Sequence, residues 1–160
     1  MKVENVMTSP ARSCAPTDNL HTAAEIMWQA DCGCVPVTDE NRRAVGIITD
    51  RDICIAAHLD GEPLRSSTVG AVMSNIVHTC HPDDSLREVA TTMSENRLRR
   101  LPVVDADGRL VGIVSLNDLA LAASEPPRKS GDDALTQEEV AATLAAICQH
   151  RPNSGSAEPH

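Results

Sequence analysis

The residues that could do chemistry in this chain are two hydroxyl–carboxylate pairs with the same spacing. Thr49 precedes Asp52, and Ser115 precedes Asp118, each after a short β-branched run and at the expected start of a helix. Free N–H groups at a helix N-terminus can bind a phosphate, to which the hydroxyl adds one hydrogen bond. The carboxylate one turn on can accept hydrogen bonds from the vicinal hydroxyls of a ribose. The same spacing is also typical of a capping box, which needs no ligand, and the residues alone leave both interpretations open.

Six cysteines offer a second kind of chemistry. They are Cys14, Cys32, Cys34, Cys54, Cys80 and Cys148. The chain has no Cys-x2-Cys pair and no regular Cys/His spacing, so thiols acting as small apolar side chains are favoured over metal ligands. A partial zinc site is the alternative, with Cys32, Cys34, Cys54 and His58 as its candidate ligands.

Composition and charge limit the class of function. The 160 residues include 23 acidic and 14 basic side chains, for a net charge of −9, which repels the backbone of nucleic acids. No apolar run approaches the ~18 residues of a membrane span, and the N-terminus lacks the apolar core of a signal peptide. We therefore expect a soluble, cytoplasmic protein that binds neither nucleic acid nor membrane.

An internal duplication relates the two hydroxyl–carboxylate pairs. Overlaying residues 6–53 on residues 72–119, at a constant shift of 66 positions without gaps, gives 16 identities in 48 positions. Average residue usage would give about three. Because the shift carries Thr49 onto Ser115 and Asp52 onto Asp118, both pairs occupy the same place in a repeated unit.

The pattern of each repeat predicts the element order β-α-β-β-α. In repeat 1, residues 12–15 are expected to be extended, residues 34–38 and 44–48 to pair as a hairpin, and residues 50–58 to form the closing helix. Between the extended segment and the hairpin, a helix carries one apolar stripe at Leu20, Ala23, Ala24 and Met27. The sheet is small, with helices on one face.

Helix starts are predicted from capping residues. Thr17 or Asp18 can cap the first helix of repeat 1, and Asp84 or Ser85 the first helix of repeat 2. Thr136 forms a capping box with Glu139 at the start of a last, C-terminal helix.

The expected boundaries follow these patterns. They are 1–58 for repeat 1, 59–68 for a linker, 69–123 for repeat 2, 124–150 for a linker and the C-terminal helix, and 151–160 for a disordered tail.

Three motifs and their partners in repeat 2 carry a family resemblance over about residues 3–123. They are Val6-Met7-Thr8, Val35-Pro36-Val37 and Gly46-Ile47-Ile48-Thr49-Asp50-Arg51-Asp52. The chain resembles a tandem pair of cystathionine beta-synthase (CBS) domains, called a Bateman module, of the stand-alone bacterial type. The resemblance implies an α+β fold in which two β-α-β-β-α repeats pack as a pseudo-two-fold pair, here followed by a C-terminal helix.

The resemblance also implies ligands and site residues. The expected ligands are AMP, ADP, ATP or S-adenosylmethionine, bound for regulation in clefts between the repeats, with no required cofactor. The hydroxyls of Thr49 and Ser115 would contact phosphate, and Asp52 and Asp118 ribose. The base would pack near Ser13, Cys14, Val35 and Pro36, and near Thr79, Cys80, Leu101 and Pro102. Basic residues near phosphate would be Arg99 and Arg100 in repeat 2, and Arg51 in repeat 1.

The expected protein is therefore a non-enzymatic regulatory module that signals to an unknown protein partner. The resemblance further implies a homodimer formed through the helices. One alternative is a redox- or zinc-responsive stress protein that uses the Cys and His residues. Another is a dimerisation scaffold without a ligand.

Overall fold

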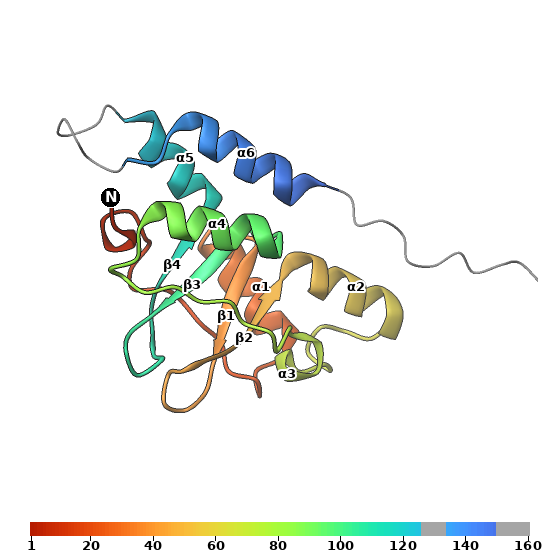
Figure 1. Ribbon diagram of the computed structural model, residues 1–160. Coiled ribbons are helices and arrows are strands. Elements are labelled where there is room, and N and C mark those ends of the chain that lie inside the picture. Colours follow the sequence, from red (N-terminus) through yellow and green to blue (C-terminus); the bar gives the residue numbers. More distant parts are fainter. Residues whose placement is uncertain (126–133, 150–160) are drawn as a thin grey trace, which may run out of the picture.

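The structure is a computed structural model that describes residues 1–125 and 134–149. The expected tail at 151–160, and part of the expected 124–150 segment, lie outside the described residues. Repeat 1 contains η1 (Val3–Asn5), α1 (Leu20–Gln29), β1 (Cys34–Thr38), β2 (Ala44–Thr49) and α2 (Asp50–Asp60). Repeat 2 contains α3 (Val69–Val72), α4 (Leu86–Asn96), β3 (Arg100–Val104), β4 (Leu110–Ser115) and α5 (Leu116–Ser124), and α6 (Gln137–Cys148) follows (Figure 1).

Each repeat is built around one antiparallel hairpin. In the first, Cys34 pairs with Thr49 and Val35 with Ile48, and in the second Arg100 pairs with Ser115 in the same register. The segment that was expected to supply a further strand makes only one parallel bridge per repeat, Cys14 with Val37 and Cys80 with Val103. The predicted α+β class and element order are confirmed, with the first strand of each repeat shortened to that bridge.

The helix caps decide where the helices begin. Asn19 caps α1 by accepting a hydrogen bond from the Thr22 N–H at 3.0 Å, so the prediction of Thr17 or Asp18 was wrong. The Asp18 carboxylate instead accepts from the Ala15 N–H at 2.8 Å, which closes the preceding turn. Ser85 caps α4 in a capping box with Glu88, and Thr136 caps α6 with Glu139, as predicted.

The N-terminal segment packs on the opposite repeat. Val3 is fully buried in the core of repeat 2, and Met7 packs against the same cluster. The Thr8 N–H donates to the Ile113 carbonyl of β4 at 2.9 Å. Reciprocally, Val69 is buried in the core of repeat 1 and Met73 packs against it. The first segment of each sequence repeat therefore packs in the core of the other repeat.

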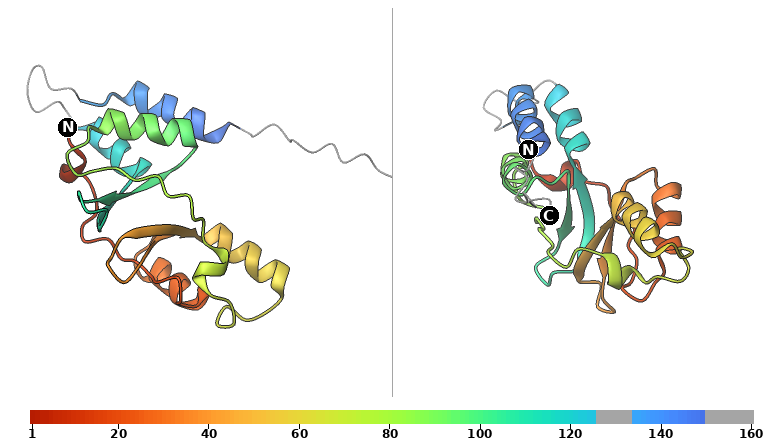
Figure 2. Two further views of the ribbon diagram at one scale, coloured as in Figure 1. Left: turned by 60° about the horizontal axis from the view of Figure 1, so that its bottom comes forward. Right: turned by 90° about the vertical axis from the view of Figure 1, so that its right-hand side faces the viewer.

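The two repeats face each other about a pseudo-two-fold axis (Figure 2). Arg43 and Arg109, which are equivalent positions 66 residues apart, form an isolated bridge between the two hairpin turns. A residue can pair with its own equivalent only where both lie close to the axis. The axis therefore runs between the hairpins.

The C-terminal helix α6 covers the helical face of repeat 2. It packs on α4 and α5 (Figures 1 and 2), where Leu135 and Ile147 join the core cluster that contains Met93 and Leu119. The Arg87 Nε of α4 pairs with the Glu139 Oε1 at 2.8 Å. None of the helices in the described ranges is both long enough and apolar enough to cross a membrane.

Candidate ligand-binding cleft

Both hydroxyl–carboxylate pairs form complete capping boxes. The Ser115 hydroxyl donates to Oδ2 of Asp118 at 2.6 Å, the Ser115 N–H donates to the same oxygen at 2.7 Å, and the Asp118 N–H donates to the hydroxyl at 3.3 Å. Thr49 and Asp52 repeat this geometry, with 2.7 Å between the hydroxyl and Oδ2. In each case the carboxylate is held through Oδ2, so Oδ1 can accept a hydrogen bond from a ligand. The carboxylate can therefore cap the helix and still accept from a ligand, while the single hydroxyl proton is used by the cap.

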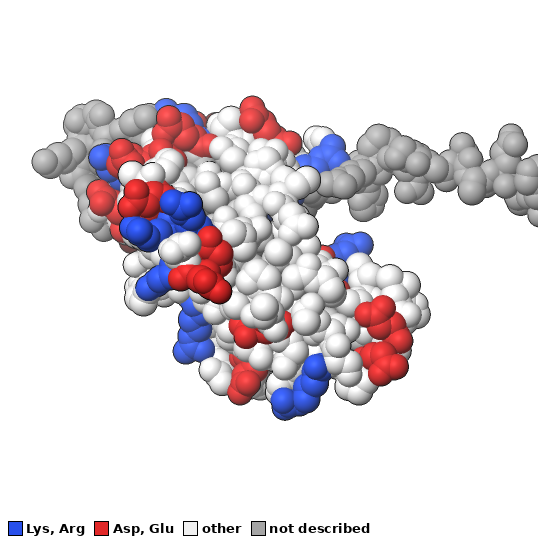
Figure 3. Space-filling model, turned by 90° about the horizontal axis from the view of Figure 1, so that it is seen from below, with Lys and Arg blue, Asp and Glu red and all other residues white. Residues whose placement is uncertain are grey.

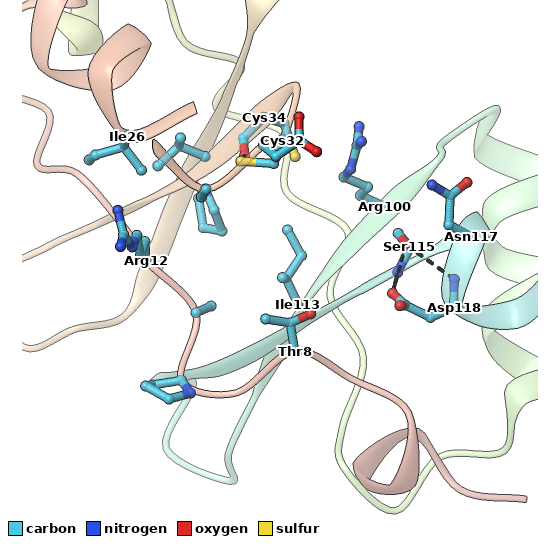
Figure 4. Close-up of a pocket in the computed structure, with 16 residues that line it drawn as sticks. Thr8, Arg12, Ile26, Cys32, Cys34, Arg100, Ile113, Ser115, Asn117 and Asp118 are labelled. Carbon is cyan, nitrogen blue, oxygen red and sulfur yellow. Dashed lines mark hydrogen bonds between the residues drawn. The ribbon is translucent and has the colours of Figure 1, made fainter. Parts of the chain in front are cut away.

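The pair on repeat 2 lines a cavity between the repeats. This inter-repeat cavity has a volume of about 320 Å³, within the range of small-ligand pockets, which starts at roughly 300 Å³. One wall comes from β1, the end of α1 and Arg12, and the other from β3, β4, the start of α5 and Thr8, which lies beside Ile113 (Figure 4). The lining residues are Thr8, Pro10, Ala11, Arg12, Ile26, Ala30, Asp31, Cys32, Cys34, Val35, Pro36, Arg100, Ile113, Ser115, Asn117 and Asp118.

Five of the residues expected at a site meet in this cavity although they come from different repeats. Val35 and Pro36 belong to repeat 1, while Arg100, Ser115 and Asp118 belong to repeat 2. The structure therefore joins the apolar wall of one repeat to the hydroxyl–carboxylate pair of the other.

The other expected residues lie elsewhere. Asp52 borders a groove beside α2 with Ile55 and Leu59, and Arg51 and Arg99 are exposed. Cys14, Cys80 and Leu101 are buried in the two cores, and Pro102 is buried in β3. Ser13 accepts a hydrogen bond from the Thr38 hydroxyl at 3.2 Å, and Thr79 is exposed.

Sequence reasoning missed four polar residues of the cavity, of which Thr8 was quoted only as part of a family motif. Asn117 occupies the position equivalent to Arg51, so the duplication itself could have identified it. Arg12 precedes the expected base-binding segment and donates to the Gln29 Oε1 at 3.1 Å. Asp31 has a φ of 49° just after α1, and no pattern in the sequence marks it as a site residue.

Charges of both signs line the inter-repeat cavity. Arg12 and Arg100 are cationic, and Asp31 and Asp118 are anionic. Burial raises the pKa of the Cys34 thiol to about 11, while the adjacent Arg100 guanidinium acts in the opposite direction through its charge and a hydrogen bond. A cation beside a helix N-terminus suits a phosphate, and the walls of Val35, Pro36 and Ile113 suit an apolar ring.

The alternative metal ligands do not converge. Within residues 1–125 and 134–149, no group of three or more His, Cys, Asp or Glu side chains has the arrangement to hold a metal ion. Cys34 is buried, Cys54 is exposed, and Cys32 donates to the Cys34 carbonyl at 3.3 Å.

One face of the molecule carries charges of both signs. On the face shown in Figure 3, Lys and Arg side chains lie among Asp and Glu side chains, with uncharged residues across the centre. This face therefore has no broad basic patch for a phosphate backbone.

Comparisons with known proteins match both repeats to one family. The family model described as "CBS domain" matches residues 3–58 and 69–125. The CBS domain pair of protein MJ0100, in complex with 5′-methylthioadenosine and S-adenosyl-L-methionine, superposes with a TM-score of 0.69 and 30% identity, covering 76% of this chain and 94% of that one. CBSX2 in complex with AMP gives a TM-score of 0.67 and 29% identity, covering 76% and 95%.

One further relative binds a metal. Hypoxic response protein 1 of Mycobacterium tuberculosis is 30% identical over 116 residues, which are 72% of this chain and 80% of the relative. A crystal structure of Hypoxic Response Protein I with two coordinated zinc ions superposes with a TM-score of 0.70 and 28% identity, covering 79% of this chain and all of that one.

Proposed function

The chain belongs to the CBS domain family, and we propose that it is a regulatory module that binds an adenosine-containing ligand between its repeats and passes the bound state to a protein partner. The observation that carries this proposal is the inter-repeat cavity, in which the Ser115–Asp118 pair faces Val35 and Pro36. AMP, ADP, ATP and S-adenosylmethionine share the adenosine that this cavity suits.

Each part of such a ligand has a complementary wall. The phosphate lies at the N-terminus of α5, where Arg100 and backbone N–H groups bind it. Oδ1 of Asp118 accepts from the ribose hydroxyls while Oδ2 keeps the capping box closed. The adenine packs against Val35 and Pro36. The adenosine ligands of the MJ0100 and CBSX2 structures support this assignment.

A thermal-shift screen tests the proposed ligand class. The parent protein is heated with adenosine, AMP, ADP, ATP and S-adenosylmethionine, and with GMP and CMP as base controls. A ligand present at 100 times its Kd stabilises by about 2.7 kcal/mol. At least one adenosine-containing ligand should raise the Tm and the control nucleotides should not. An unchanged Tm with every adenosine-containing ligand would contradict the proposal.

We propose a homodimer as the assembled form, formed through the helical face of repeat 1. On repeat 2, α6 fills the groove over Ala90, Met93 and Leu119. The equivalent residues of repeat 1, Ala24, Met27 and Ile53, line an open groove of about 700 Å³.

This groove has a large exposed apolar side chain in its lining. Trp28 lines the groove and is 87% exposed. On repeat 2 the equivalent face is covered by α6 of the same chain. On repeat 1 the exposed apolar face is buried against the matching face of a second copy.

The zinc-responsive alternative rests on the relative with two zinc ions. Metal analysis of untagged protein purified without chelator decides it. About one zinc per chain that is lost in the Cys32→Ser, Cys34→Ser variant would favour that alternative over nucleotide regulation.

A further inference from the structure

The end of α1 separates the inter-repeat cavity from the open groove of repeat 1. Ile26 and Ala30 of this helix line the cavity, whereas Met27 and Trp28 of the same helix line the groove. Asp31, directly after the helix, lines both. A ligand in the cavity and a second copy in the groove would therefore meet the same side chain.

The backbone of Asp31 is held in place while its carboxylate is free. The next N–H, that of Cys32, donates to the Met27 carbonyl at 3.0 Å and ties the turn to α1. Within residues 1–125 and 134–149, the Asp31 carboxylate makes no hydrogen bond and no ion pair. Cys32 also lines both spaces, but its thiol already donates to the Cys34 carbonyl at 3.3 Å. Asp31 is thus the shared residue with an unused polar group.

On the groove side, the charge of Asp31 opposes docking of a second copy. A further carboxylate, Asp50, lines the groove but not the inter-repeat cavity, and none of the described residues that line the groove is Lys or Arg. In a two-fold dimer the same surface of both copies meets, so Asp31 and Asp50 of one copy come close to those of the other. Like charges brought together in an interface weaken it.

On the cavity side, Asp31 shares a wall with the residues proposed to hold the base. Val35 and Pro36 of β1 lie on this wall. Arg12, the cation of the wall, donates to the Gln29 Oε1 at 3.1 Å. A carboxylate only accepts hydrogen bonds, and the 6-amino group of adenine donates them. A base on this wall therefore offers Asp31 the partner that it lacks.

We propose that Asp31 accepts from the 6-amino group of the bound base and thereby turns its charge away from the groove, so that 6-aminopurine ligands strengthen the homodimer. This inference rests on the proposed function and on its homodimer. A 6-oxopurine presents an acceptor at the same position and cannot engage the carboxylate. The coupling is reciprocal, so the dimer binds the ligand more tightly than the monomer does by the same factor.

Sedimentation equilibrium of the full chain tests the proposal. The dimer Kd is measured without ligand, with saturating AMP, and with IMP, which has a 6-oxo group in place of the 6-amino group. AMP should lower the dimer Kd by about five-fold or more, the lower end of typical coupling between two sites. Calorimetry should show IMP binding about ten-fold or more weaker than AMP, which corresponds to loss of a hydrogen bond to a charged group.

Three isosteric variants separate the two roles of Asp31. Asp31→Asn should strengthen the dimer without ligand, abolish the effect of AMP on it and narrow the preference for AMP over IMP, because an amide both donates and accepts. Asn also tolerates the φ of 49° at this position. Asp50→Asn removes the charge that lines only the groove, so it should strengthen the dimer and keep the AMP effect. Glu25→Gln, on an exposed α1 residue that lines neither space, should change neither.

The outcomes separate this inference from the proposed function. If the parent binds AMP and dimerises, but its dimer Kd is the same with and without AMP, the inference is overturned alone. The same holds if folded Asp31→Asn keeps the full AMP effect. If the parent binds no adenosine-containing ligand, or stays monomeric at every concentration, the proposed function or its homodimer fails and the inference fails with it.

Discussion

Met7 lies directly over Gly112, so that a Cβ added to Gly112 would lie 2.7 Å from the Met7 Sδ and 3.1 Å from the Thr8 carbonyl oxygen. Gly46 has the same relationship to Met73 and Ser74, with corresponding distances of 2.5 Å and 3.1 Å. Because each glycine has no Cβ, the segment that crosses over from the other repeat can pack closely against its strand. The two contacts hold the module together on both sides of its axis.

Gly112→Ala should therefore destabilise the protein. Overpacking of this kind typically costs about 1–3 kcal/mol, measured as the free energy of unfolding in urea. Met7 can move more easily than the Thr8 backbone, so Met7→Ala combined with Gly112→Ala should recover part of the loss, visible as a coupling of about 0.5–3 kcal/mol. Parental stability for Gly112→Ala would show that the crossing segment is not held at this point.

The two motif aspartates should each hold ribose in one site. Asp118→Ala should remove the tighter AMP-binding event in calorimetry, and Asp52→Ala the weaker one, because each removes the acceptor for the ribose hydroxyls. Both variants also lose a capping box, at a cost of about 1 kcal/mol. Glu88→Ala is the matched control, since it breaks the Ser85–Glu88 capping box away from the cavity. If both aspartate variants bind AMP like the parent while folded, the two turns are helix caps only.

The cysteines should fall into reactivity classes. Burial raises the pKa of Cys14 and Cys34 to about 11 and that of Cys80 to about 12, so at pH 8 these thiols are protonated as well as inaccessible. Cys54 and Cys148 are exposed and should react first with a disulfide reagent. All six should react in denaturant. Rapid reaction of Cys14, Cys34 and Cys80 in the native protein would contradict their buried placement.

The ion pair that ties α6 to α4 should make stability depend on pH. The hydrogen bond from Arg87, followed by that from the Thr136 backbone, lowers the pKa of Glu139 to about 2, below the ordinary value of about 4.3 in an unfolded chain. The contribution of the Arg87–Glu139 pair to the free energy of unfolding is therefore complete above the unfolded pKa of Glu139, and it is lost as pH falls towards 2.

Urea unfolding at several pH values measures this contribution. The difference in stability between the parent and Glu139→Gln should be constant above about pH 5 and shrink below it. Glu138→Gln, on the neighbouring exposed residue, should not reproduce that pH dependence. A difference that stays constant down to pH 2 would mean that the Arg87–Glu139 pair contributes no pH-dependent stability.

Trp28 should report the dimer. It is the single tryptophan of the chain, and its burial against a second copy should shift its emission to shorter wavelength and return it towards that of free indole on dilution. Trp28→Glu should give a monomer by light scattering, whereas Ile76→Glu, at another exposed apolar residue, should remain dimeric. A parent that is monomeric at high micromolar concentration would contradict the homodimer.

Local patterns determined much of this protein. The duplication, the two hairpins, the capping boxes at Thr49 and Ser115 and the C-terminal helix all follow from signals within a few residues of one another, such as apolar periodicity and side-chain capping. Where two short polar residues competed for one cap, as at Asp18 and Asn19, the local signal was ambiguous and the prediction was wrong.

Contacts between the repeats were decided by the tertiary structure alone. Met7 and Met73 are the same residue type, as are Gly46 and Gly112, so the sequence fits a Met7–Gly46 pairing as well as the Met7–Gly112 pairing that forms. The same ambiguity hid the joining of Val35 and Asp118 in one cavity. In a duplicated chain, equivalent residues carry equal local preferences, and only the packing of the whole module determines which repeat each of them contacts.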